Sequence, residues 1–172
     1  MTSAELLTDA FERIRGAVYQ VVDGLTPEQL THRIDKGANS IAWLVWHLTR
    51  IQDDHVAGVA GLDQVWTSAG WAERFGLPFK DTATGYGHSP DDVAAVRVGS
   101  GDLLTGYFEA VHAQTIGYVE TLTDEDLTRV VDTWWDPPVT LGVRLVSVIA
   151  DDLQHVGQAA FVRGHLGRTK AV

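Results

Sequence analysis

The residues best suited to chemistry lie in an apolar segment near the C-terminus, residues 140–165. Within it, Asp151 and His155 stand four positions apart, so on a helix their side chains lie on one face, one turn apart. A carboxylate and an imidazole on an otherwise apolar face are costly to bury unless a partner satisfies them, and a divalent metal ion is a common partner. We therefore predict that this pair supplies two ligands of a metal site. A third ligand must come from another segment.

His47 is the candidate third ligand. It lies in the apolar stripe of another predicted helix, together with residues such as Leu44 and Leu48. Two histidines and one carboxylate suit zinc, and equally nickel, iron or manganese, and they leave one or more positions for water or substrate. The alternative is that His47 is a hydrogen-bonded core histidine while Asp151 and Asp152 lie on a solvent-exposed face.

Composition narrows the chemistry further. The chain has 172 residues, with 13 Lys and Arg against 23 Asp and Glu, and its net charge of −10 argues against nucleic-acid or anionic-membrane partners. It contains no cysteine, which excludes disulfides, thiolate ligands and a cysteine nucleophile, so a metal site must use nitrogen and oxygen ligands. The N-terminus has no leader pattern, and no apolar run approaches the roughly 20 residues of a membrane span. We therefore expect a cytoplasmic protein.

Four long helices are expected to position these residues. Helical periodicity and capping signals predict helices over residues 3–23, from 39 or 40 to 60, over 102–122, and a fourth that begins after Thr140. The predicted fold class is all-α, a four-helix bundle with a long crossover between helices 2 and 3. The length of the chain predicts a single domain over residues 1–172.

The connecting segments also carry signals. Residues 61–89 are rich in glycine and aromatic side chains, which predicts a crossover that packs over the bundle as a lid and includes a short turn of helix. A proline after Ser89 predicts a short helix to about residue 97, and residues 130–139 are expected to form an extended loop. Trp134 and Trp135 in that loop are expected to be core or lid aromatics.

Two segments resemble the metal-binding segments of the DinB-like superfamily. They are W-L-V-W-H-L-T-R-I-Q-D-D-H at residues 43–55 and A-D-D-L-Q-H-V-G-Q-A-A-F-V-R-G at residues 150–164. The similarity extends over nearly the whole chain in helix order. Within the superfamily, the chain resembles the branch that includes the N-terminal domain of mycothiol-dependent maleylpyruvate isomerase.

The resemblance implies a ligand set. It assigns His47, Asp151 and His155 to a metal that is usually zinc or nickel in that family, and Gln158 matches the family's glutamine three residues beyond the last histidine. The sequence departs from the family at Asp151, where a longer glutamate or a histidine is usual. The shorter side chain would weaken the site, change its metal or bring in Asp152 instead. The isomerase also has a second domain that these residues do not match, so maleylpyruvate isomerisation does not follow.

The favoured function is therefore a thiol-dependent transferase or isomerase. In this hypothesis the ion binds the sulfur of a low-molecular-weight thiol, such as mycothiol, and lowers its pKa so that the thiolate attacks a small electrophilic substrate. Asp152, Gln158 and Arg144 are candidate helpers. Arg144 would attract an anionic substrate, or would simply form a surface salt bridge.

Two other functions remain open at this stage. One is a metal-dependent hydrolase that uses metal-bound water, with Asp152 or Asp54 as a base. The other is a non-catalytic, stress-related binding protein of the same fold. Bundles of this type often pair through exposed helices, so the sequence is compatible with a homodimer.

Overall fold

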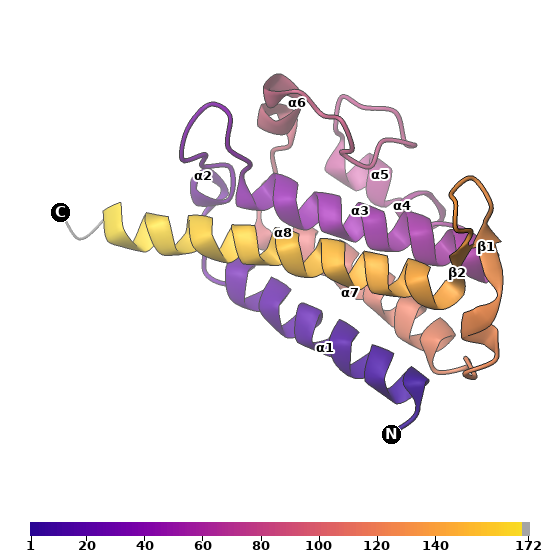
Figure 1. The fold of residues 1–172 in the computed structure, drawn as a ribbon. Helices are drawn as coiled ribbons and strands as arrows, with labels where there is room; N and C mark the ends of the chain where they lie inside the picture. The colour runs from indigo at the N-terminus through magenta and orange to yellow at the C-terminus, as the bar shows by residue number, and fades with distance from the viewer. Residues whose placement is uncertain (170–172) are drawn as a thin grey trace.

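Four long helices dominate the computed structural model, which describes residues 1–169 (Figure 1). They are α1 (Ser3–Val22), α3 (Ile41–Ala60), α7 (Gly101–Val119) and α8 (Leu141–Thr169). Helices α1 and α3 each pack against both α7 and α8, so α1 and α3 occupy opposite corners of the bundle. The predicted all-α four-helix bundle is therefore confirmed. Within the described residues, no helix is both long and apolar enough to cross a membrane.

The direction of the helices explains the long crossover. Helix α8 runs antiparallel to α3, whereas α7 runs parallel to α3 (Figure 1). Because α7 starts at the end of the bundle where α3 also starts, the chain must travel back along the bundle between them. It does so through α4 (Val65–Ser68), α5 (Trp71–Phe75) and α6 (Pro90–Ala95). The crossover predicted between the second and third long helices is confirmed.

Local sequence signals set the helix ends. Thr2 caps α1 in a reciprocal capping box with Glu5, and the hydroxyl of Ser40 accepts a hydrogen bond from the backbone N–H of Trp43 at the start of α3. Helix α3 ends at Gly61, whose φ of 67° suits a residue without a Cβ atom. A short helix α2 (Pro27–Leu30), with proline in its first turn, separates α1 from α3.

Helix α3 is the most buried helix of the bundle. It lies between α7 and α8, and the crossover helix α4 also packs against it. As a result, every residue from Ile41 to Arg50 is buried, so burial extends around the whole circumference of this half of the helix. The core of α1, in contrast, is a single stripe at the predicted positions Leu7, Phe11, Ile14, Val18, Val21 and Val22.

A short hairpin replaces the extended loop predicted at residues 130–139. After a 3₁₀ turn, η1 (Asp126–Thr128), strand β1 (Val130–Asp132) pairs antiparallel with β2 (Val139–Thr140). The prediction for the tryptophans between them was wrong, since Trp134 is 89% and Trp135 is 63% exposed. Pro137 and Pro138, next to β2, have no N–H groups with which to extend the ladder towards the hairpin tip.

Candidate metal centre

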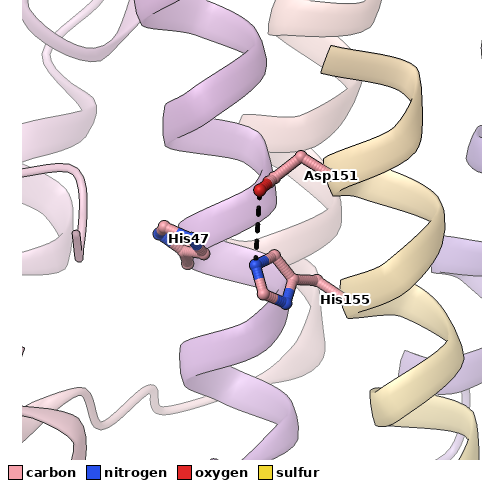
Figure 2. Close-up of side chains that lie close together, drawn as sticks. All are labelled: His47, Asp151 and His155. Atoms are coloured by element: carbon pink, nitrogen blue, oxygen red, sulfur yellow. Dashed lines mark ion pairs between the residues drawn. The ribbon is translucent and has the colours of Figure 1, made fainter. Parts of the chain in front are cut away.

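The antiparallel packing of α3 and α8 brings His47, Asp151 and His155 together. Figure 2 shows Asp151 and His155 extending from successive turns of α8 towards α3, which carries His47. Each of the three residues offers one candidate ligand atom, and these three atoms all lie within 4.8 Å of one another. A tetrahedral ion with bonds of about 2.1 Å needs ligand atoms roughly 3.4 Å apart, so small side-chain rotations would close the group around one ion.

His47 is held by the crossover. Its Nδ1 lies 2.5 Å from the carbonyl oxygen of Thr84. A carbonyl only accepts hydrogen bonds, so Nδ1 carries the proton and Nε2 keeps a free lone pair, which is the form that binds metal. The ring also stacks on Trp43, with centroids 4.6 Å apart. Burial lowers the pKa of His47, and this favours the neutral ring that a metal requires.

His155 and Asp151 form the half of the site that α8 contributes. The Nε2 atom of His155 lies 3.6 Å from Asp151 Oδ1, close to the separation expected for two ligands of one ion. Nδ1 of His155 faces the side-chain oxygen of Gln158 at 3.4 Å, a long contact that favours a proton on Nδ1. Gln158, one of the candidate helpers, therefore lies beside His155.

Whether the site fits an ion can be judged from the surroundings of Oδ2, the second carboxylate oxygen of Asp151. Asp151 Oδ2 is buried and has no hydrogen-bond partner among the residues that the structure describes. An unsatisfied buried carboxylate oxygen costs free energy, and a cation between this carboxylate and the two imidazoles would remove that cost. Two imidazole nitrogens and one carboxylate oxygen are also a donor set that divalent metals accept. The residues therefore fit a divalent ion.

Asp152, the alternative ligand, lies elsewhere. It belongs to the core stripe of α8, between Val148 and Val156, and its side chain is fully buried. Burial raises the pKa of its carboxyl well above the ordinary value, and the charge of Asp151 adds to the effect. The structure therefore brings Asp151, and not Asp152, to the two histidines.

Arg144, the other predicted helper, is already paired. Its guanidinium donates to Asp132 at 2.7 Å and contacts Nδ1 of His55 at 3.2 Å. These contacts match the salt bridge that was the alternative to an anion-binding role. Burial and the charge of Arg144 lower the pKa of His55.

Two clefts lie on either side of the ligands along α8. An apolar cleft of about 530 Å³ is lined by Ile34, Leu44, Phe161 and other residues, and it includes Gln158. A more polar cleft of about 710 Å³ lies towards the start of α8, where its lining includes Arg144 and residues of the hairpin. Both volumes are in the range of small-molecule sites.

Several residues near the ligands were not predicted. His88 accepts a hydrogen bond from the indole N–H of Trp43 at 3.2 Å and stacks on Trp46, with centroids 5.7 Å apart. The contact of Thr84 with His47 was also missed. These contacts come from the crossover, which has no periodicity to indicate which of its residues face α3. A main-chain carbonyl such as that of Thr84 leaves no signal in the sequence.

Comparison with known proteins identifies the family and shows a similar fold. A family model described as the DinB superfamily matches residues 10–159, so the chain belongs to the DinB superfamily. The fold is similar to the crystal structure of a conserved protein from Enterococcus faecalis, with a TM-score of 0.89 and 32% sequence identity. That similarity covers 95% of this chain and 96% of the other. A search of curated proteins gave no match.

Proposed function

We propose that this protein is a metal-dependent enzyme that uses a low-molecular-weight thiol in a transferase or isomerase reaction. The observation that carries the proposal is the meeting of His47, Asp151 and His155 at the junction of α3 and α8, where Oδ2 of Asp151 is buried without a hydrogen-bond partner in residues 1–169. Zinc is the favoured ion, and nickel, iron and manganese also suit these ligands.

The chain's own residues have distinct tasks in this proposal. His47, Asp151 and His155 would hold the ion, and Thr84 and Gln158 would keep the two imidazoles in the tautomers that leave Nε2 free. When bound, a divalent ion lowers the pKa of a coordinated thiol. Because the sequence has no cysteine, that thiol would be a cosubstrate such as mycothiol or a chemically similar molecule.

The apolar cleft supports a small electrophile as the other substrate. It begins at Gln158, one turn beyond His155, and its apolar walls include Leu44 and Phe161. Among the residues that the structure describes, Asp35 is the one charged side chain of its lining, and none of these lining residues is a lysine or an arginine. This cleft therefore suits an uncharged, largely apolar molecule better than a dicarboxylate, so the reaction would differ from maleylpyruvate isomerisation.

Thiol-dependence assays on metal-loaded protein test the proposal. Protein purified without chelators or a nickel column would be analysed for metal, reloaded with zinc, and mixed with uncharged electrophiles in the presence and absence of mycothiol, glutathione or cysteine. We expect turnover that requires both metal and thiol and that His155→Ala abolishes. Turnover of esters or amides without thiol would instead indicate a hydrolase. Binding of metal without any turnover would favour a non-catalytic protein.

A further inference from the structure

Arg50 on α3 is a fully buried cation with an unusual set of contacts. Its Nε donates to the carbonyl of Ala83 at 3.1 Å, and Nη2 donates to the carbonyl of Asp81 at 3.2 Å. Nη1 donates to the side-chain oxygen of Gln64 at 2.9 Å. Burying a guanidinium is expensive unless its donors are satisfied, and here most of its partners belong to the crossover.

Asp53, one turn further along α3, supplies the countercharge and extends the network. Its carboxylate lies 3.6 Å from Nη1 of Arg50 and accepts hydrogen bonds from the backbone N–H groups of Val65 and Trp66, at 2.9 and 2.7 Å. The hydroxyl of Tyr107 on α7 also donates to it at 2.8 Å. Together, Arg50 and Asp53 attach both the beginning and the later part of the crossover to α3.

The crossover segment that Arg50 holds leads directly to a backbone carbonyl that contacts the candidate ligand His47. Thr84 follows Ala83, and its carbonyl accepts the hydrogen bond from Nδ1 of His47. Next comes Gly85, whose φ is +97°, and a Cβ atom there would lie 2.6 Å from Nδ1 of His47. The crossover backbone therefore closes on the imidazole, one turn of α3 away from the guanidinium that anchors it.

We propose that Arg50 is a positioning residue for the metal centre. By fixing the carbonyls of Asp81 and Ala83, it holds the carbonyl of Thr84 where it keeps His47 in the Nδ1–H tautomer, with Nε2 available to the ion. The effect of Arg50 on metal affinity rests on the proposed function, whereas the effect of Arg50 on the tautomer of His47 does not. A merely structural Arg50 would affect the stability of the bundle but not the tautomer of His47.

The test uses Arg50→Lys, which keeps a positive charge beside Asp53. A lysine ammonium lacks the planar fork of guanidinium donors, so it cannot reach the same separated acceptors. The matched control is Gln52→Met, because Gln52 is equally buried on α3 but faces α7, where it donates to Thr115 at 2.7 Å. Urea unfolding would establish how far each variant is destabilised.

The first measurement is the tautomer of His47 in metal-free protein, read from nitrogen-15 NMR of the imidazole at a pH where the ring is neutral. We expect a single Nδ1–H tautomer in the wild type and in Gln52→Met, and a mixture in Arg50→Lys. The second is zinc affinity by competition with a chelator. We expect Arg50→Lys to weaken it by roughly 10–100-fold, as loss of a group that orients a ligand typically does, and the control to leave it unchanged.

The outcomes separate the two proposals. If the wild type does not bind zinc, the proposed function fails, while the tautomer measurement still decides the role of Arg50. If Arg50→Lys is destabilised but keeps both the tautomer and the zinc affinity, the positioning role is overturned. Should Arg50→Lys fail to fold, Gly85→Ala displaces the same backbone while leaving Arg50 in place. A single unchanged tautomer in Gly85→Ala would likewise overturn the proposal.

Discussion

Replacing Asp152 with alanine should stabilise the metal-free protein at neutral pH. The side chain of Asp152 is fully buried in the core stripe of α8, and both of its carboxyl oxygens lack a hydrogen-bond partner in the described part of the chain. Leaving such a group unsatisfied costs about 1–3 kcal/mol. Alanine removes this cost and favours the helix by about 0.5 kcal/mol, while the small cavity it creates offsets a similar amount. We expect a net gain of about 1–3 kcal/mol near pH 4.5, where the buried carboxyl is protonated, and a larger gain at pH 7.

The gain should depend on pH with a definite sign. Burial raises the pKa of Asp152 in the folded protein well above its value in the unfolded chain. The wild type therefore has its full stability below the pKa that Asp152 has in the unfolded chain. It loses stability as pH rises from there towards the pKa of Asp152 in the folded protein. Between these two pKa values, the advantage of Asp152→Ala over the wild type should grow by up to about 1.4 kcal/mol per pH unit.

Urea unfolding with a chelator present, between pH 4.5 and 7.5, measures this difference. Asp9→Ala is a suitable control, because Asp9 forms an exposed pair with Arg13 and its loss removes a carboxylate without changing the core. The reasoning is refuted if Asp152→Ala destabilises the protein at pH 7, which would mean that the carboxyl has a favourable partner. A gain that does not change with pH would equally contradict it.

Two further predictions concern stability. Tyr107→Phe should destabilise the protein by about 1–3 kcal/mol, because the lost hydroxyl donates to Asp53 and accepts from Arg50 at 3.3 Å in a buried site; a change below about 0.5 kcal/mol in urea unfolding would contradict this. Arg15→Ala should cost less than about 1 kcal/mol, since its pair with Glu109 is more than one third exposed on both sides. A larger loss in the same assay would show that this pair does more than a surface ion pair.

The fold and the candidate ligands could be predicted because they follow periodic signals. The stripe of α1 is apolar on one face only, so its period of 3.6 residues is clear. Asp151 and His155 interrupt an apolar face at a spacing of four, and His47 lies inside another apolar stripe. The capping signals at Asn39 and Ser40 placed the start of α3 within two residues of the observed start at Ile41.

The rest of the site could not be predicted because α3 is covered on more than one side. The run T-R-I-Q-D-D, residues 49–54, has the composition of a solvent-exposed face, yet Arg50, Gln52 and Asp53 are buried against α7 and the crossover. Helical periodicity distinguishes a buried from an exposed face only when one face is covered. Similarly, nothing in residues 130–139 indicated that the tryptophans would lie at the tip of a hairpin beyond the bundle.

Equilibrium metal binding to the metal-free protein tests the central claim most directly. Zinc titrated into wild type, His47→Ala and His155→Ala in a calorimeter should give one site per chain in the wild type and no comparable site in either variant. At zinc concentrations of 100 times the Kd, the wild type should also gain about 2.7 kcal/mol in unfolding free energy. A wild type that binds no zinc, nickel, iron or manganese, or variants that bind zinc as tightly as the wild type, would contradict the assignment of His47, Asp151 and His155 as a metal centre.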